Sequence, residues 1–393
     1  MAQVPLETIT EAQLQRWRLV EDFRQRLDQA ARSVSLHATF SDPARLLDLA
    51  SYLSLFLFGL LNPVVRTMRG LCAASDLKRV QDEVCGRHVS LGSFSETQRL
   101  LDPALLERVF TQLAAEVGQA TAATAPARTW NWMARDGSVF RALPRMHWAL
   151  YGAGRGGDSH AVKLHLNLHL LDDKPVRAQV RRGKDCERAV WREQWQPGDA
   201  YVGDRYFGED YQLFGQWMDQ GCAFVIRLKG QAVVTVEEEL PISPQDRQAG
   251  VIRQAWVRLG AQVARRSRRV RLVWVEADGH SLLLVTHAEP KDLTAAEVSL
   301  LYRQRWQVEL FFRWIKCILG CRHWLAESPH GVTIQIYLAL IAALLLQLYT
   351  GQRPTQRMME LIQFYLLGVI GLDELWAGLE RERKRAQKTK KRA

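Results

Sequence analysis

An uninterrupted helical pattern from Thr294 to Leu319 constrains the fold of this chain more than any other stretch. Thr294 followed by Glu297 fits a capping box, in which a hydroxyl and a carboxylate satisfy the first amides of a helix. Neither Pro nor Gly interrupts the run before Gly320. At roughly 100° per residue, an apolar and a charged stripe run side by side along it. We therefore expect a long helix that docks one stripe on a core.

The second stripe of this helix is charged and aromatic. Tyr302, Arg305, Glu309 and Lys316 fall within a sector of about 60°, with Arg313 just beside them. An amphipathic surface helix with local pairing, such as Arg305 with Glu309 at i,i+4, would explain these charges on composition alone. The fixed spacing Y-x2-R-x3-E-x6-K is more specific than composition, so it directs attention to acidic residues upstream.

Ahead of this helix the chain is first helical and then β-rich. Residues 10–120 read as helices, and small or Pro-containing residues at 120–129 predict a linker. Alternating apolar residues then predict strands. These strands are expected at 130–140, 161–170, 176–180, 199–203 and 223–228, with a helix at 211–220 between the last two. Further strands are expected at 233–236, 251–259, 270–276 and 282–286, and helices at 328–380.

The segment 76–99 resembles a helix-turn-helix. Its second helix would open at Ser93, with Glu96 completing a capping box. Ser95, Gln98 and Arg99 would then be exposed at its start, where such side chains can meet phosphates or base edges. An ordinary helical hairpin is the simpler interpretation of the same pattern.

Two aspartates end predicted strands. Asp136 stands in Ala-Arg-Asp-Gly-Ser, and Asp204 stands in Val-Gly-Asp-Arg-Tyr. Alone, an aspartate at a strand end is more often a turn or cap residue than a metal ligand. Together with Glu309 on the later helix, however, the two make a joint pattern of three carboxylates in the order strand, strand, helix.

These residues resemble the signature of a branch of the bacterial DDE transposases, the insertion-sequence-four family. Tyr302, Arg305, Glu309 and Lys316 match its helix motif position for position. Its first carboxylate has an Asp-Gly-Ser/Thr context, which Asp136 matches. Its second usually reads Asp-Arg-Gly-Tyr, whereas here a tyrosine, residue 206, replaces the glycine. The departure bears on the turn that follows the second aspartate.

The resemblance implies an α/β fold with a ribonuclease-H-like catalytic core interrupted by a β-rich insertion. An N-terminal helical DNA-binding region would precede the core and a helical part would follow it. The implied boundaries are 1–120 for the DNA-binding region, 126–230 and 293–350 for the two parts of the core, 231–292 for the insertion, and 351–393 for the C-terminal region with its basic tail.

The resemblance also implies metal-dependent cleavage and strand transfer of transposon DNA ends. Both steps are in-line displacements at phosphorus, which two divalent cations about 3.5–4 Å apart can catalyse. Asp136, Asp204 and Glu309 would hold two Mg²⁺ or Mn²⁺ ions per active site, because hard cations prefer oxygen ligands. The remaining members of the motif, Tyr302, Arg305 and Lys316, would contact DNA near the cut, and Arg313 beside them is a further candidate.

A formal net charge of +11 and a pI of about 9.5 indicate a polyanionic partner. Within the β-rich segment, Arg265, Arg266, Arg268 and Arg269 cluster where the sequence has no acid. A phosphate backbone attracts such clusters, although charges that guard a strand edge are the alternative. The expected partners are double-stranded DNA, as terminal inverted repeats and target, and a second copy of the chain in a homodimer.

In the family, an aromatic residue of the insertion holds a base that is flipped out of the DNA end. Trp256 and Trp274 are the candidates here, although core packing explains each of them more simply. The C-terminal run 381–393 is basic and is expected to be disordered, with non-specific contact to DNA.

Six scattered cysteines without a Cys-x2-Cys pair favour a reducing compartment over a disulfide or zinc framework. Residues 1–7 lack the features of a secretion signal. The apolar run 336–346 is too short to span a bilayer, so it predicts a buried helix. A cytoplasmic location without a membrane is therefore expected, and the resemblance implies the bacterial cytoplasm in association with the nucleoid.

Three other functions compete with a transposase. A metal-dependent nuclease without strand transfer is the closest of these. Only the full four-residue motif favours a transposase over it. A DNA-binding protein of transposon origin that no longer cleaves is disfavoured because all three carboxylates are present. A glycoside hydrolase with paired carboxylates would leave the basic charge and the Tyr-Arg-Lys companions unexplained.

Overall fold

The computed structural model describes residues 18–32, 40, 42, 47–122, 130–152, 159–185, 189–190, 192, 195–260, 268–277, 279–318, 324–350 and 352–390. The chain divides into two compact units. Unit 1 comprises Met1–Ala120, Phe140–Ala161 and Arg313–Ala393, and unit 2 comprises Thr121–Val139 and Val162–Phe312.

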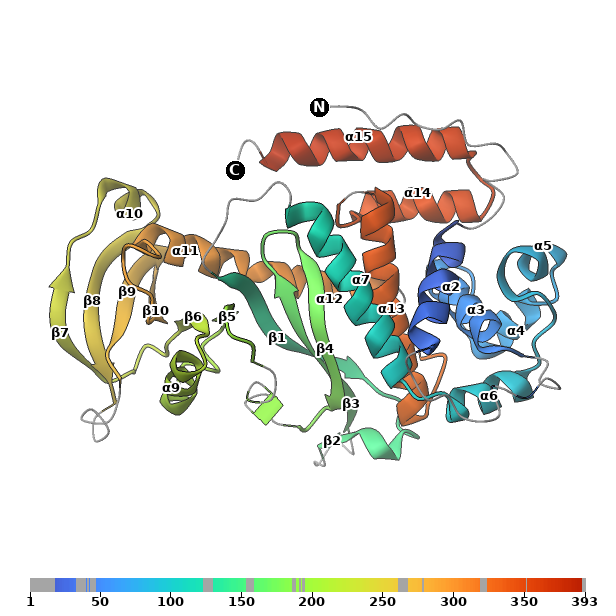
Figure 1. Cartoon of the computed structure of the whole chain (residues 1–393), viewed down its shortest axis with the longest axis horizontal. Helices are drawn as coiled ribbons and strands as arrows, with labels where there is room; N and C mark the ends of the chain where they lie inside the picture. The colour runs from blue at the N-terminus through green and yellow to red at the C-terminus, as the bar shows by residue number, and fades with distance from the viewer. Residues whose placement is uncertain are drawn as a thin grey trace. The chain divides into compact units, whose positions relative to one another are not determined.

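Unit 1 is mainly helical (Figure 1). Its N-terminal helices are α2 (Arg18–Ala31), α3 (Leu49–Leu61), α4 (Met68–Ala74), α5 (Lys78–Val80), the π-helix η2 (Gln81–Cys85), α6 (Leu91–Leu100) and α7 (Ala104–Ala122). A 3-10 turn η3 (His147–Ala149) and a short strand β2 (Leu150–Gly152) follow. The C-terminal helices are α13 (Pro329–Thr350), α14 (Gln356–Leu366) and α15 (Leu372–Lys390).

An aromatic cluster joins the N-terminal helices of unit 1. The ring centroids of Tyr52 and Phe94 lie 4.7 Å apart, and those of Phe56 and Phe94 lie 5.6 Å apart. Phe110 on α7 packs against Tyr337 on α13 at 6.1 Å. Such ring pairs are favourable beyond the area they bury, so they tie the first helices to the C-terminal half of the chain.

The buried helix predicted at 336–346 is confirmed as part of the longer helix α13. Every residue of that run is buried. The window Pro329–Leu348 is long and apolar enough to cross a membrane by length and composition, but 89% of it is buried inside the protein. That is how the core helix of a globular domain is packed.

The predicted start of the second helix in segment 76–99 is wrong. The helix α6 begins at Leu91, and the side chain of Ser90 caps it by accepting a hydrogen bond from the Ser93 amide. Ser90 is therefore the N-cap residue, and Ser93 already lies within the helix. Gln98, expected to be exposed, is only 5% exposed, whereas Arg99 is exposed.

The basic tail is not disordered where the structure describes it. Helix α15 continues to Lys390, alongside α14 (Figure 1). Acidic residues interleave with the basic ones, so Arg385 pairs with Glu382 at 2.7 Å and Lys384 pairs with Glu380 at 3.6 Å. Ion pairs three and four residues apart stabilise a helix. The net charge of the tail does not reveal these pairs. Residues 391–393 lie outside the described part.

Unit 2 is built on a mixed sheet. Its strands are β1 (Asn131–Arg141), β3 (Ser159–His169), β4 (Lys174–Arg182), β5 (Asp199–Gly203), β6 (Ala223–Arg227), β7 (Val234–Leu240), β8 (Val251–Leu259), β9 (Val270–Ala277) and β10 (His280–Thr286). The order is β2-β3-β1-β5-β6-β10-β9-β8-β7, with β4 beside β3. Strand β1 pairs parallel with β5, and β5 pairs parallel with β6.

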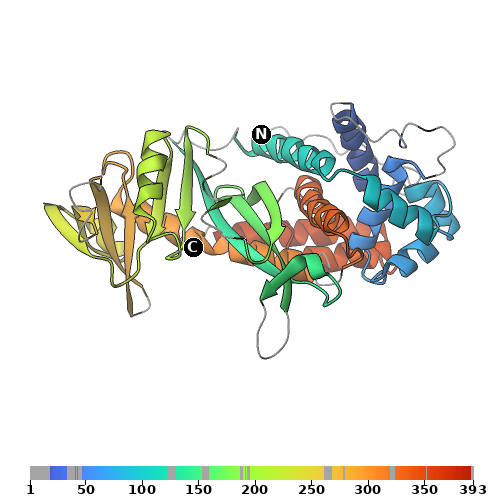
Figure 2. The same cartoon turned by 90° about the horizontal axis from the view of Figure 1, so that it is seen from below.

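The β-rich segment that follows β6 continues the same sheet. Strand β10 pairs antiparallel with β6, and β9, β8 and β7 extend the sheet outward as antiparallel neighbours (Figure 2). The helix α10 (Pro244–Gln248) lies between β7 and β8 in sequence. Hairpins added at one edge lengthen a sheet without disturbing the strands already paired.

Helix α9 (Tyr211–Asp219) covers one face of this sheet. Its Leu213, Phe214 and Trp217 are buried with Phe224 of β6 and Leu272 of β9 in one apolar cluster. The rings of Phe214 and Phe224 stack at 4.9 Å. The cluster runs from the central strands into the added hairpins, so a single core holds both parts of unit 2 together.

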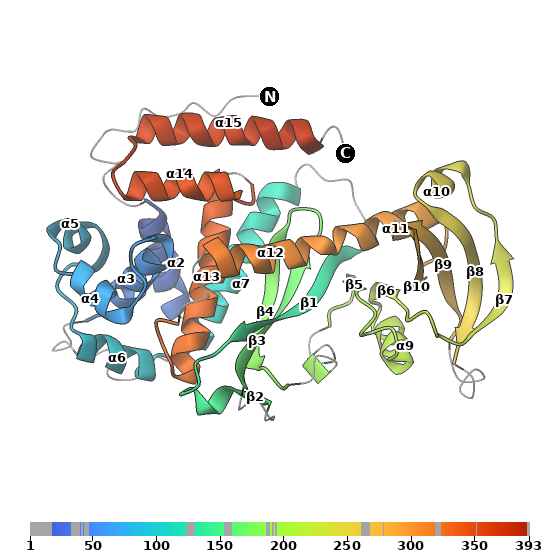
Figure 3. The same ribbon diagram turned by 180° about the vertical axis from the view of Figure 1, so that it is seen from behind.

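Helices α11 (Ala295–Gln304) and α12 (Trp306–Ile318) replace the single helix that the sequence predicts. The predicted capping box of Thr294 and Glu297 is confirmed. The two helices follow each other end to end (Figure 3), but Arg305 interrupts the ladder, since its amide bonds to the Tyr302 oxygen three residues back. No Pro or Gly causes this break; Arg305 is instead engaged by groups outside the helix, described below.

One buried histidine gives unit 2 a pH-dependent stability. Burial, reinforced by the cations Lys163, Arg135 and Arg181, lowers the pKa of His165 to about 3. The unfolded chain takes up this proton near pH 6.5, whereas the folded chain does so only near pH 3. His165 therefore leaves the free energy of unfolding unchanged above about pH 6.5, and it lowers this free energy as the pH falls from there towards 3.

We predict that His165→Gln removes part of the acid sensitivity of folding. Between pH 7 and pH 4 the wild-type protein should lose on the order of 1–3 kcal/mol more unfolding free energy than the variant. Urea unfolding at several pH values measures this difference. Parallel pH profiles for the two proteins would contradict the buried, neutral state of His165.

Candidate active site

The prediction that both aspartates end strands is wrong for Asp136, which lies within β1 (Asn131–Arg141), and is confirmed for Asp204, which directly follows β5 (Asp199–Gly203). The parallel register matches Ala134 with Val202. Continued by two residues, it sets Asp136 alongside Asp204, and neighbouring strands lie about 4.8 Å apart. Because side chains alternate, both carboxylates leave the same face of the sheet. The strand register thus brings together two residues that are distant in the chain.

A backbone amide orients each aspartate. The Gly137 amide donates to Asp136 Oδ1 at 2.7 Å, and the Tyr206 amide donates to Asp204 Oδ1 at 2.9 Å. Both side chains are partly buried. Such short loops fix a carboxylate rotamer, so both side chains are held in place by their own backbone.

The turn after Asp204 tolerates the tyrosine that departs from the family pattern. Tyr206 is 40% exposed, and its ring packs edge-on against Phe207 at 5.2 Å. Its φ is not positive, since Asp173 is the one non-glycine residue with positive φ in the described ranges. The close approach occurs at Gly208 instead, where an added Cβ would lie 2.3 Å from the Arg227 oxygen of β6.

Glu309 reaches this site through Arg305. Arg305 Nη2 lies 2.8 Å from Glu309 Oε1, and Arg305 Nη1 lies 3.9 Å from Asp136 Oδ2. The guanidinium also lies 5.7 Å from the ring centroid of Tyr302. Three of the four residues of the helix motif therefore meet around one of the aspartates, all within unit 2.

The environment keeps Arg305 charged. Its side chain is only 14% exposed. Burial lowers the pKa of Arg305, but Tyr302, Glu309 and Asp136 together outweigh burial and raise it above its ordinary value. A permanent cation among carboxylates compensates their mutual repulsion.

The other two cations predicted on this helix belong to unit 1. Lys316 Nζ lies 4.7 Å from the ring centroid of Phe140, a cation–π contact. Arg313 is exposed on α12. Nothing in these contacts assigns either residue to DNA, so both remain predictions.

An exposed tryptophan beside the site was missed from the sequence. Trp306 is 48% exposed, although large aromatic side chains are usually buried. It follows Tyr302 by four residues and precedes Glu309 by three, so the helix places it on the charged stripe. The spacing was available in the sequence, but the residue type suggested the core.

The arginines of the β-rich segment are paired with acids that the local sequence does not show. Arg268 pairs with Asp219, and Arg269 pairs with Glu237 and Glu238 on β7. The nearby Arg271 is fully buried and donates to the Leu293 oxygen. Arg265 and Arg266 lie outside the described residues. This arrangement fits the guarded edge, while leaving Arg268 and Arg269 nearly half exposed.

The two candidate base-flipping residues are packed under arginines. Trp256 is 7% exposed, with the Arg269 guanidinium 4.8 Å from its ring centroid. Trp274 is partly buried, with Arg253 at 4.5 Å. Core packing, the simpler explanation, accounts for both positions as they stand.

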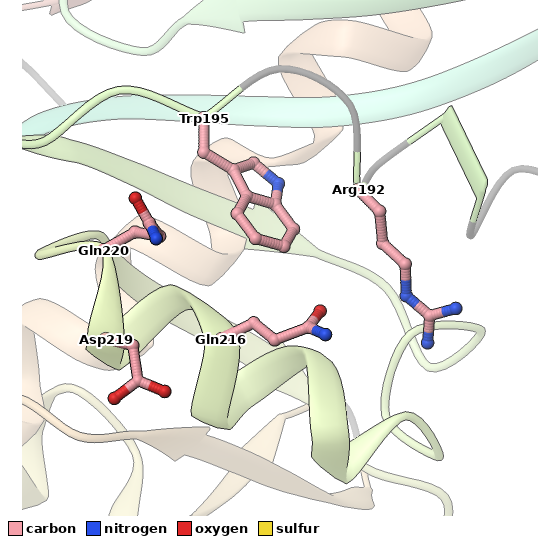
Figure 4. Close-up of a pocket in the computed structure, with 5 residues that line it drawn as sticks. All are labelled: Arg192, Trp195, Gln216, Asp219 and Gln220. Atoms are coloured by element: carbon pink, nitrogen blue, oxygen red, sulfur yellow. The ribbon is translucent and has the colours of Figure 1, made fainter.

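A separate hollow of about 380 Å³ lies on the surface of unit 2 (Figure 4). The ring of Trp195 overhangs α9, and the lining residues are Arg192, Trp195, Gln216, Asp219 and Gln220. Asp136, Asp204 and Glu309 do not line it, and neither does any residue of the helix motif. The candidate active site is therefore separate from this hollow.

The carboxylates fit a hard divalent cation by their chemistry. Asp136 and Asp204 offer oxygens from adjacent strands, and Glu309 approaches from the helix. Across the described ranges, however, no three His, Cys, Asp or Glu side chains already converge as metal ligands. Arg305 pairs with Glu309 in this arrangement, so a metal would be received by the two aspartates and completed by Glu309.

Comparison with known proteins identifies the family of the chain. Residues 133–345 match the family model described as "Transposase DDE domain". The match covers more than half of the chain, and the chain therefore belongs to this family of DDE transposase domains.

Individual relatives align over part of their length. The chain is 27% identical over 216 residues to "Probable transposase for insertion sequence element IS5377" of Geobacillus stearothermophilus, which is 54% of each protein. It is 36% identical over 89 residues to "Transposase for insertion sequence element IS421" of Escherichia coli, 23% of this chain and 24% of that one. The chain thus spans at most about half the length of these relatives.

A solved structure of a piggyBac transposase synaptic complex with hairpin DNA aligns over 87% of this chain and 81% of that one. The sequence identity is 8% and the TM-score is 0.36. A likeness at this level carries no argument about the site.

We predict that Gly208→Ala destabilises the protein by about 1–3 kcal/mol, because the new methyl group meets backbone that cannot rotate away. Gly230→Ala is the matched control, since nothing lies within 4 Å of its Cβ position. Urea unfolding of both variants measures the effect. Equal stability of the two would show that the turn after Asp204 can shift away from β6.

Proposed function

We propose that this protein is a DDE transposase of the insertion-sequence-four type, which cleaves transposon DNA ends and transfers the strands in a metal-dependent reaction. The observation that carries the proposal is the register of β1 on β5, which sets Asp136 beside Asp204, with Glu309 linked to Asp136 through Arg305. Family membership supports the general class. The fixed motif on the helix supports the particular branch.

The sheet order supports a ribonuclease-H-like core. Three strands in the order β4-β3-β1 continue into β5 and β6, which run parallel to β1. On this basis 126–230 and 293–350 form the core, and 231–292 forms the insertion. The hairpins β7 to β10 lengthen the sheet at the edge next to β6, which agrees with an insertion there.

The residues present divide the chemistry among them. Divalent cations, when bound, activate the attacking oxygen and stabilise the leaving one. Asp136 and Asp204 would hold Mg²⁺ or Mn²⁺ with their paired carboxylates, and Glu309 would complete the set. Arg305 presents two adjacent donors that suit a phosphate, and the exposed ring of Trp306 offers a stacking surface for a nucleotide.

The wider surface is proposed to bind DNA. Arg313 and Lys316 on α12, and Arg268 and Arg269 in the β-rich segment, would contact phosphates. Ser95 and Arg99 on α6 would contribute from the N-terminal helices. Terminal inverted repeats and target DNA are the proposed ligands, a homodimer is the proposed assembly, and the nucleoid is the proposed location. A nuclease without strand transfer is the closest rival.

We predict that Asp136→Asn, Asp204→Asn and Glu309→Gln each lower Mg²⁺-dependent cleavage on the order of 10³-fold or more. Binding to the same DNA in a gel-shift assay should change little, because the substitutions conserve shape. The substrate is a short duplex that carries the ends of the element, incubated with Mg²⁺ or with EDTA.

Asp373→Asn is the control for these variants, since this exposed aspartate opens α15. Normal cleavage by any of the three carboxylate variants would overturn the assignment. Cleavage without joining of the cut end to target DNA would favour the nuclease.

We predict that Arg268→Gln with Arg269→Gln weakens DNA binding and lowers its salt dependence. Each phosphate contact that is lost reduces the slope of log K against log salt by about 0.9. Binding titrations at several salt concentrations measure the slope. Arg357→Gln, which removes an exposed arginine paired with Glu360 within α14, is the control. An unchanged slope would leave the two arginines as guards of a strand edge.

A further inference from the structure

The position of Arg305 relative to the carboxylates is unusual for a residue whose proposed role is to hold DNA. One arm of its guanidinium contacts Glu309 at 2.8 Å and the other approaches Asp136 to 3.9 Å. The guanidinium therefore faces two of the three carboxylates of the candidate active site at once. An arginine that served DNA alone would leave its fork free toward solvent.

The burial of Arg305 strengthens this arrangement. The side chain is 14% exposed, compared with 45% for Arg253 and Arg269 in their surface pairs. Solvent and salt screen a partly buried pair less than an exposed one. The attraction of Arg305 for the two carboxylates is thus screened less than that of the exposed pairs.

Arg305 also blocks the oxygen that a metal would use. Divalent cations need carboxylate oxygens at about 2.0–2.6 Å. Glu309 Oε1 is already bonded to the guanidinium, and Asp136 Oδ2 faces its other arm. An ion and the guanidinium cannot occupy the space between these oxygens together, since both are cations and would repel each other.

One donor of Arg305 is unused in this arrangement. Arg305 Nε is buried, and no hydrogen-bond partner for it exists among the described residues. A buried donor without a partner is costly, so this atom favours a ligand that supplies an oxygen. A DNA phosphate beside the carboxylates is such a ligand.

We propose that Arg305 is a placeholder cation, which holds Asp136 and Glu309 in the metal-free protein and is displaced towards the DNA phosphate when divalent metal enters. This inference rests on the metal site of the proposed function. It assigns Arg305 a positioning role before DNA arrives, in addition to the contact with DNA. Metal and Arg305 then compete for the same carboxylates.

Competition makes two opposite predictions for one substitution. Without Arg305, the carboxylates repel each other uncompensated, so the metal-free protein becomes less stable. Without Arg305, metal also meets no competitor, so it binds more tightly. A merely structural arginine would lower stability and metal affinity together. A residue that serves DNA alone would change neither.

The experiment uses the full chain without DNA and titrates Mn²⁺ by electron paramagnetic resonance. We expect Arg305→Gln to bind Mn²⁺ roughly tenfold more tightly than wild type, the scale of one lost, partly buried ion pair. Its melting temperature without metal should fall, and its rise on adding Mn²⁺ should exceed that of wild type. Arg305→Lys should lie between the two, because an ammonium cannot span both carboxylates as a fork does.

Arg303→Gln is the matched control. Arg303 is two residues away, is exposed, and donates to the Ala249 oxygen at 3.2 Å, and it forms no salt bridge with a carboxylate of the described residues. It should match wild type in Mn²⁺ affinity. Glu309→Gln should weaken Mn²⁺ binding in either background, which locates the ion.

Equal or weaker Mn²⁺ binding by both Arg305 variants, with Glu309→Gln still weakening it, would overturn the placeholder and leave the metal site intact. Absence of Mn²⁺ binding in wild type and in every variant would overturn the metal site of the proposed function and the placeholder with it. The two failures therefore give different results.

Discussion

The parallel pairing of β1 with β5 is the constraint on which the candidate site depends. It alone aligns Asp136 with Asp204, since the two come from distant parts of the chain. The strands can pair in this register because α9 and the hairpins bury the same apolar cluster against them. A slip of one residue would turn one aspartate to the opposite face, so the packing of the core and the chemistry of the site are coupled.

Charge compensation recurs in unit 2 in two forms. At the candidate site, Arg305 alone serves two carboxylates and is largely buried. Along β7 and β8, acids and arginines pair across the strands in the open, where each pair contributes little to stability. The largely buried Arg305 is suited to hold the two carboxylates of the candidate site. The exposed arginine pairs along β7 and β8 are suited to guard the strand edge or to face DNA.

Much of the architecture could be predicted from the sequence because local pattern and tertiary structure agree there. Strands β5 and β8 have the predicted bounds, and the capping box at Thr294 was found. The errors arose where tertiary contacts override local pattern. The helix is interrupted at Arg305, although no Pro or Gly lies in that run. Gln98 is buried by packing. The charged tail is helical because of ion pairs that its net charge does not reveal.

The sequence by itself determined the class of this protein, because residue types at fixed spacing are a local property: the three carboxylates, the helix motif around Glu309 and the alternating strands. Only the tertiary structure decided which of these residues meet. It set Asp136 against Asp204 through strand register, and it placed Arg305 between Asp136 and Glu309. It also paired acidic residues of β7 with arginines that have no acidic residue near them in the sequence. The physical reason is that pairing and charge compensation act between distant segments, and only folding joins those segments.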